Sequence, residues 1–211
     1  MVSSLEIRND VPVLTIDDEA IAPMMVWGGN NAKLSGTAPL MSAAGFHLYT
    51  TSFEMPWPRE GEDYDFSETD AELDVLLAND RGALTMPRIG VEPPDWWKEE
   101  HPEEMPVWEN GKSDRFISIT SERWLGEAAA HILRYVGHLE SKWGEHVFAY
   151  HPCALNSGEW YYASTIWDYA DWGLRNYDVS FAHGYRRWLG KRYGNVRNLN
   201  EAWRSSYDDF T

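Results

Sequence analysis

The chain has 211 residues and a formal net charge of −16, which comes from 18 lysines and arginines against 34 aspartates and glutamates. This charge repels polyphosphate, so we expect no nucleic-acid partner and favour a neutral or cationic one. Hydrophobic residues make up 43% of the chain, enough for a substantial core, yet no apolar run is long enough to span a membrane.

The first half of the chain is predicted to alternate strands with helices. The stretch "GTAPLMSAA" is expected to form a short helix or turn between the first two strands. A longer helix follows, with Ser67 and Asp70 as a capping signature, an apolar face of leucines and Gly82 as its end. The strands are predicted at residues 21–27, 45–53 and 83–91.

Pro87 stands inside the third of these strands. A central strand needs the backbone N–H that proline lacks. We therefore expect a bulge or an early strand end at this position.

The second half of the chain continues the same alternation. A long helix is predicted over about residues 121–143, because apolar side chains recur there at four-residue spacing. A fourth strand is expected at 147–150, and another helix at about 178–193. Asn198 and Glu201 indicate a capping box for a last helical turn.

Strands that alternate with helices predict an α/β fold built from four parallel βα units. The loops after the third and fourth strands are long, at about thirty and about twenty residues, and such folds place their chemistry on loops at one end of the sheet.

The candidate site residues lie at the ends of the predicted strands. Carboxylates beside aromatic rings suit glycosidic chemistry, because apolar walls raise the pKa of an acid and flat rings pack against a sugar. On the local pattern alone, Glu159 is equally an ordinary loop carboxylate. Arg88 either binds a substrate hydroxyl or pairs with a buried carboxylate. The substrate-binding candidates beside Glu159 are Trp57, Arg88, Trp96, Asn156 and Trp160.

The remaining composition favours a carbohydrate partner without a cofactor. Twelve tryptophans exceed what a core of this size needs, although core filling explains any single one. The seven histidines include no H-x-x-x-H or H-E-x-x-H motif, and the single Cys153 excludes an intrachain disulfide and a cysteine-based metal site. The N-terminal stretch is not a signal peptide, which leaves the compartment open and slightly favours the cytoplasm.

Four motifs resemble glycoside hydrolase family 42, the β-galactosidase family, and occur in the same order as in that family. They are "WPREGEDYDFSETD" at 57–70, "PPDWWKEEHPE" at 93–103, "ENGK" at 109–112 and "FAHGYRRWLGKRYGNVRNLNEAW" at 181–203. Together they cover most of residues 45–205.

The resemblance implies a (β/α)8 TIM barrel and a retaining glycosidase that acts on terminal β-galactosides or related sugars. In the clan, the acid/base glutamate closes strand four and the nucleophile closes strand seven, and Glu159 matches the strand-four position. Gly158 stands where the clan has asparagine, so Asn156 is expected to reach the same sugar hydroxyl. Many members carry a zinc-binding cysteine cluster after strand four, but residues 160–178 contain no cysteine and no metal is implied.

Four βα units are half of such a barrel, which typically needs about 250 residues. We therefore interpret residues 1–211 as the N-terminal part of a single (β/α)8 catalytic domain that stops before strands five to eight, and we expect this chain alone to be inactive. The resemblance implies a homotrimer for a full-length protein. One alternative is a non-catalytic carbohydrate-binding barrel, which the departure at Gly158 favours. Another is a structural barrel that oligomerises through its tryptophan-rich loops.

Overall fold

The computed structural model describes residues 1–27, 31–155, 158–160 and 173–210. It divides into two compact units. The first comprises Met1–Val91 with Ala129–Ala154, and the second comprises Glu92–Ala128 with Leu155–Thr211.

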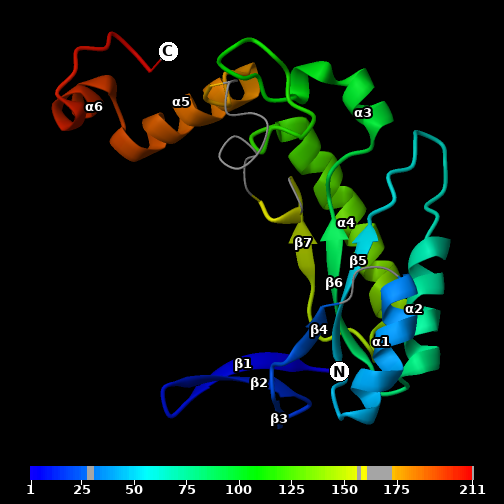
Figure 1. The fold of residues 1–211 in the computed structure, drawn as a ribbon. Helices are drawn as coiled ribbons and strands as arrows, with labels where there is room; N and C mark the ends of the chain where they lie inside the picture. Colours follow the sequence, from blue (N-terminus) through cyan, green and yellow to red (C-terminus); the bar gives the residue numbers. More distant parts are fainter. Residues whose placement is uncertain (28–30, 156–157, 161–172, 211) are drawn as a thin grey trace. The chain divides into compact units, whose positions relative to one another are not determined.

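The first unit contains a four-stranded parallel sheet, which confirms the predicted α/β class (Figure 1). The fourth strand lies a few residues later than the predicted 147–150. The predicted first strand is divided, because Pro23 interrupts it and Ile21 belongs to a separate strand. In spatial order the strands are β4 (Met25–Trp27), β5 (Leu48–Glu54), β6 (Leu84–Gly90) and β7 (His151–Cys153).

Strand β6 accommodates Pro87 through an irregularity in its neighbour. Thr85 pairs with Val147, whereas Arg88 pairs with His151, so the segment opposite Pro87 contains one residue more than β6. Thr85 exchanges two backbone hydrogen bonds with this segment. The backbone nitrogens of residues two apart on a strand point to the same neighbouring strand, so the nitrogen of Pro87 faces this bulge, like that of Thr85. The missing N–H of Pro87 therefore interrupts no regular ladder of hydrogen bonds. The expected bulge is therefore present, but in the segment leading to β7.

Helices pack against one face of this sheet and form its core. Helices α1 (Asn31–Ala43) and α2 (Ser67–Asn79) lie side by side (Figure 1). Ala38 from α1, Leu76 from α2 and Tyr49 from β5 meet in one buried cluster. Helix α4 (Glu122–Trp143) has the predicted extent.

The start and end of α2 differ from the sequence expectation. Ser67 is the first helical residue, and the N-cap Phe66 makes no side-chain capping bond. Instead, Asp65 accepts a hydrogen bond from the backbone N–H of Ser67 at 2.9 Å. The helix ends at Asn79, before Asp80 rather than at Gly82.

Asp70 links α2 to the end of α4. Its Oδ1 lies 2.8 Å from both His138 Nε2 and Trp143 Nε1, and its Oδ2 lies 2.8 Å from Lys142 Nζ. Burial alone would raise the pKa of Asp70, but these hydrogen bonds outweigh it and lower the pKa to about 2.

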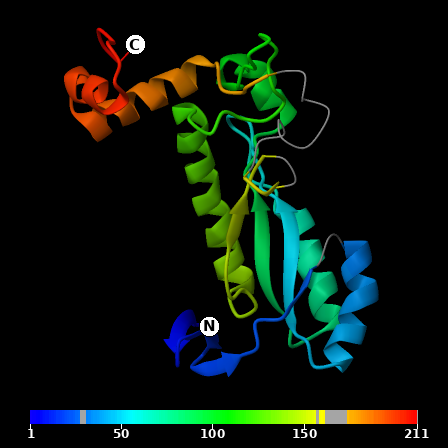
Figure 2. The same cartoon turned by 60° about the vertical axis from the view of Figure 1, so that its left-hand side comes forward.

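The N-terminal strands form an antiparallel sheet that the sequence analysis did not predict. Its strands are β1 (Ser3–Arg8), β2 (Val11–Ile16) and β3 (Glu19–Ile21). Both connections are two-residue turns of asparagine or aspartate with positive φ. Such turns are typical of tight hairpins. The dipeptides "ND" at 9–10 and "DD" at 17–18, each between stretches of alternating apolar and polar residues, were therefore a signal that the sequence analysis missed. This sheet lies near the start of the parallel strands (Figures 1 and 2). Ile16 packs there on Leu48 and Phe148.

The second unit is mostly helical. Asp178 caps α5 (Val179–Tyr193) by accepting from Phe181 N at 2.8 Å, as its predicted position suggested. Helix α6 (Val196–Trp203) begins earlier than expected, because Asn195 rather than Asn198 is its cap. The shorter elements are α3 (Asp95–Glu100) and η1 (Pro102–Glu104). In the part of the chain that the structure describes, no helix is long and apolar enough to cross a membrane.

Candidate active site

One face of the parallel sheet carries polar side chains near the carboxyl ends of its strands. In a parallel pair, residues in register point to the same side, so the pairing of β5, β6 and β7 identifies this face. The opposite face carries Tyr49, which packs in the cluster with α1 and α2. The members of the polar face are Ser52, Glu54, Arg88, Gly90, His151 and Cys153.

Arg88 is held at this face by an aromatic ring. Its guanidinium carbon lies 4.5 Å from the ring centroid of Trp27, and only 9% of Arg88 is exposed. Trp27 itself is 66% exposed. A cation over a ring keeps a fixed orientation and still presents N–H donors at its edge. The predicted role of Arg88 in binding a substrate hydroxyl stays a prediction.

Glu54 approaches the backbone of the next strand at the same face. A Cβ on Gly90 would lie 2.6 Å from Oε2 of Glu54, so any larger residue at position 90 would displace this carboxylate. Burial raises the pKa of the Cys153 thiol, the positive charge of Arg88 opposes that shift, and the charge of Glu54 adds to it. These three side chains therefore form one electrostatic group, which the sequence analysis did not recognise. They lie on three different strands, so no spacing in the sequence brings them together.

Trp57 lies in the same unit but is buried. Only 9% of it is exposed, and its ring centroid is 4.4 Å from that of His131 on α4. Its predicted contact with a sugar stays a prediction.

The second unit contains a half-buried carboxylate, Glu92, shortly after β6. Its Oε1 accepts a hydrogen bond from Ile117 N at 2.7 Å and lies 3.3 Å from Lys98 Nζ. Its Oε2 accepts from Leu155 N at 3.3 Å. Burial raises the pKa of Glu92, although Lys98 and the two backbone donors oppose the shift. Glu92 therefore connects the loop after β6 to the segment that follows β7.

Glu159 lies between two contacts made by the described residues on either side of it. On one side, Leu155 is bonded to Glu92, and its carbonyl accepts from Gly158 N at 3.1 Å. On the other side, the ring centroid of Trp160 lies 6.4 Å from that of Trp124. Glu159, between these two contacts, is exposed to solvent.

Described residues on both sides of Glu159 have unusual backbone angles. Leu155 and Trp160 have positive φ values of 65° and 56°, which cost energy for residues other than glycine. Gly158 has φ of 64°, a region that glycine adopts without cost and asparagine tolerates. Such strain concentrates at functional segments.

The other predicted site residues are placed as follows. Trp160 is 45% exposed beside Glu159. Trp96 is half-buried on α3, whereas its neighbour Trp97 is buried and donates from Nε1 to Glu127 at 2.5 Å. Asn156 lies outside the described residues. Among the residues that the structure describes, no group of three histidine, cysteine or carboxylate side chains could hold a metal ion.

Comparison with known proteins gives this geometry a context. Residues 30–210 match the model of glycoside hydrolase family 42, described as beta-galactosidase. Beta-galactosidase LacZ of Heyndrickxia coagulans is 26% identical over 171 residues, which cover 80% of this chain and 24% of that protein. Beta-galactosidase BbgII of Bifidobacterium bifidum is 28% identical over 182 residues, which cover 80% of this chain and 23% of that protein. The chain therefore spans about a quarter of the length of these relatives.

Solved structures show the same fold. The β-galactosidase from the psychrophilic Marinomonas ef1 matches with a TM-score of 0.63 and 20% identity, over 88% of this chain and 28% of that one. The catalytic domain of β-amylase from Paenibacillus polymyxa matches with a TM-score of 0.66 and 14% identity, over 88% of this chain and 51% of that one. These neighbours are TIM-barrel glycosidases, and the four parallel strands described here are a part of that architecture. The family match, which spans most of the chain, confirms the resemblance inferred from its motifs: the chain belongs to glycoside hydrolase family 42, the β-galactosidase family.

Proposed function

We propose that this chain supplies the acid/base half of a retaining glycosidase active site that acts on terminal β-galactosides or related sugars. The observation that carries the proposal is the position of Glu159. It follows the fourth parallel strand of a family 42 chain and is exposed, and the described residues beside it contact Glu92 on one side and Trp124 on the other.

The proposed chemistry has two steps. In the first, the Glu159 carboxyl gives a proton to the leaving glycosidic oxygen while a nucleophilic carboxylate attacks the anomeric carbon from the opposite side. In the second, the Glu159 carboxylate takes a proton from the water that releases the sugar. From the family resemblance, we propose that the nucleophile follows strand seven, which is not among the four parallel strands described. We therefore propose residues 1–211 as the N-terminal part of one (β/α)8 catalytic domain, inactive without the nucleophile.

The proposed substrate-binding residues divide into polar and aromatic groups. Arg88 and Asn156 are proposed to donate hydrogen bonds to sugar hydroxyls. Trp57, Trp96 and Trp160 are proposed to contact the apolar face of the sugar ring. Trp160 is the strongest of the three, because it is adjacent to Glu159 and half exposed.

The test is turnover of nitrophenyl β-galactoside by the longest natural polypeptide that contains these residues. Glu159→Gln keeps the shape of the side chain but cannot take a proton from the water that releases the sugar, so we expect kcat to fall by about 100-fold or more. Glu99→Gln is the matched control, because Glu99 is exposed on α3 in the same unit and is expected to leave turnover unchanged. Full activity of Glu159→Gln would contradict the proposal.

The second candidate is a carbohydrate-binding barrel without catalysis. It is favoured by Gly158, which replaces the asparagine that the family pattern has directly before its acid. Saturable galactoside binding without any turnover by the same polypeptide, unchanged by Glu159→Gln, would select this candidate over the enzyme.

A further inference from the structure

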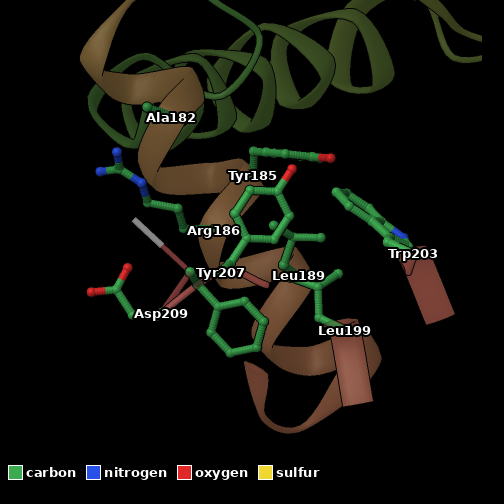
Figure 3. Close-up of a pocket in the computed structure, with 9 residues that line it drawn as sticks. Ala182, Tyr185, Arg186, Leu189, Leu199, Trp203, Tyr207 and Asp209 are labelled. Atoms are coloured by element: carbon green, nitrogen blue, oxygen red, sulfur yellow. The ribbon is translucent and has the colours of Figure 1, made fainter. Parts of the chain in front are cut away.

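The second unit contains a pocket that none of the proposed catalytic residues lines. Its volume is about 280 Å³ (Figure 3). Helices α5 and α6 form its floor with Leu189 and Leu199, which are both buried. Its walls and rim are Ala182, Tyr185, Arg186, Trp203, Tyr207, Asp209 and Phe210.

The segment after α6 is folded back over the helices by one side chain. Asn200 Nδ2 donates to the carbonyl of Tyr207 at 2.8 Å, and Asn200 Oδ1 accepts from Tyr207 N at 2.8 Å. Ser205 Oγ donates to the same Oδ1 at 2.9 Å. Arg204, with φ of 53°, makes the reversal possible. Tyr207 is therefore held at the pocket by a defined turn.

The aromatic rings at the pocket are ordered and yet open to solvent. Trp203 and Tyr207 are 42% and 52% exposed, with ring centroids 6.4 Å apart at 78°. Trp203 Nε1 donates to the hydroxyl of Tyr193 at 2.8 Å, which fixes the plane of the indole. Exposed flat rings in fixed orientations are a surface on which the C–H face of a sugar packs well.

Two charged side chains add polar recognition to the aromatic walls. In the view of Figure 3, Arg186 and Asp209 lie across the pocket from the indole of Trp203. Arg186 is half-buried, and within the described ranges it makes no ion pair or hydrogen bond. A purely apolar ligand would bury this guanidinium without compensation. An anionic ligand would meet Asp209 and a chain of net charge −16. A neutral ligand with several hydroxyls satisfies both constraints.

Size narrows the ligand further. Pockets for drug-sized ligands have volumes of about 300–1,000 Å³, so this pocket takes one small ring rather than a long ligand. We propose that the pocket between α5, α6 and Tyr207–Phe210 binds one neutral hexopyranose unit. The indole of Trp203 packs on the ring, and Arg186 and Asp209 hydrogen-bond to its hydroxyls.

The test uses the 211-residue chain, which is proposed to be inactive alone, so that hydrolysis does not consume the probe. Methyl β-galactopyranoside, methyl β-glucopyranoside and methyl α-mannopyranoside are titrated separately while the indole N–H signals are followed by ¹⁵N-edited NMR. The Trp203 signal is assigned by its loss in Trp203→Phe. At least one sugar is expected to shift it saturably.

Two variants and a matched control complete the test. Arg186→Met keeps the aliphatic stem and is expected to weaken binding by about tenfold or more, because hydrogen bonds to a charged group are lost. Tyr207→Ala removes the ring next to Trp203 but keeps the Trp203 signal, and it is expected to weaken binding as well. Arg192→Met changes an arginine in the last turn of the same helix that does not line the pocket, and should leave the affinity unchanged. The absence of a saturable Trp203 shift with all three sugars would overturn the proposal. An equal affinity in Arg186→Met and Arg192→Met would overturn it too.

Discussion

Replacing Glu92 with alanine removes an acceptor that two loops share. The backbone N–H groups of Ile117 and Leu155 lose their carboxylate, and Lys98 loses its ion-pair partner. A buried donor left without an acceptor costs about 1–3 kcal/mol. The Ile117 bond is short and counts fully, whereas the 3.3 Å bond from Leu155 counts at the low end, so we expect a loss of roughly 2–4 kcal/mol in the free energy of unfolding.

Glu92→Gln removes the negative charge of the side chain and keeps its shape, so it separates the two effects. Its amide has one acceptor oxygen, so one of the two backbone donors then faces an NH₂ group. We expect a smaller loss of roughly 1–2 kcal/mol. Both variants are measured by urea unfolding monitored by circular dichroism, with exposed Glu99→Ala as the control. A stability of Glu92→Ala within about 0.5 kcal/mol of the parent chain would refute the argument, because that is the range of neutral surface changes.

The pH dependence of the stability of Glu92→Gln, compared with that of the parent chain, independently checks the burial of Glu92. Because burial raises the pKa of Glu92 above 4.5, the folded state binds its proton more tightly than the unfolded state. The contribution of this group is therefore complete below pH 4.5 and is lost as the pH rises through its folded pKa. Against Glu92→Gln, the parent chain should lose stability over that window. A parallel pH profile of the two proteins would contradict the burial argument.

Three further predictions concern the first unit. Because its pKa is lowered from 3.8 to about 2, Asp70 contributes stability above pH 3.8 that is lost as the pH falls through about 2. Asp70→Asn should lower the melting temperature at pH 6 and reduce the loss of stability at acid pH. An unchanged loss at acid pH would contradict the role of the bonds between Asp70 and α4. Tyr135→Phe should cost about 1 kcal/mol in urea unfolding, because the buried hydroxyl lies 2.7 Å from that of Thr69. Tyr177→Phe, at an exposed position, should cost nothing measurable, and equal losses would reject the bond. Asp10→Gly should raise the melting temperature slightly, since φ of 63° in a two-residue hairpin turn favours glycine, whereas a decrease would contradict the turn assignment.

Regular periodicity made much of the fold predictable from the sequence. The amphipathic pattern of α4 and the apolar runs of β5 and β6 gave elements close to those observed, and their alternation gave the parallel sheet. The signals that failed were local ones. Asp65, rather than the predicted signature at Ser67, accepts a hydrogen bond at the start of α2. Asn195, rather than Asn198, caps α6. Such signals fail because several polar residues compete for the same backbone donors.

The candidate site was predictable only in part. The position of Glu159 after a fourth strand followed from chain order, and its catalytic role stays a prediction. The backbone hydrogen bonds to Glu92 join residues 25 and 63 positions apart, and no sequence pattern specifies such pairs. The cation–π contact of Arg88 with Trp27 depends in the same way on strand register.

Chemical rescue tests the central claim most directly. Glu159→Ala is assayed with 2,4-dinitrophenyl β-galactoside, whose leaving group needs no proton, in the longest natural polypeptide that contains the chain. If Glu159 is the acid/base, the glycosyl-enzyme accumulates and added azide restores turnover with β-galactosyl azide as the product. Activity that is intact without azide, or a variant that azide does not rescue, would contradict the account, and α-galactosyl azide would instead identify Glu159 as the nucleophile.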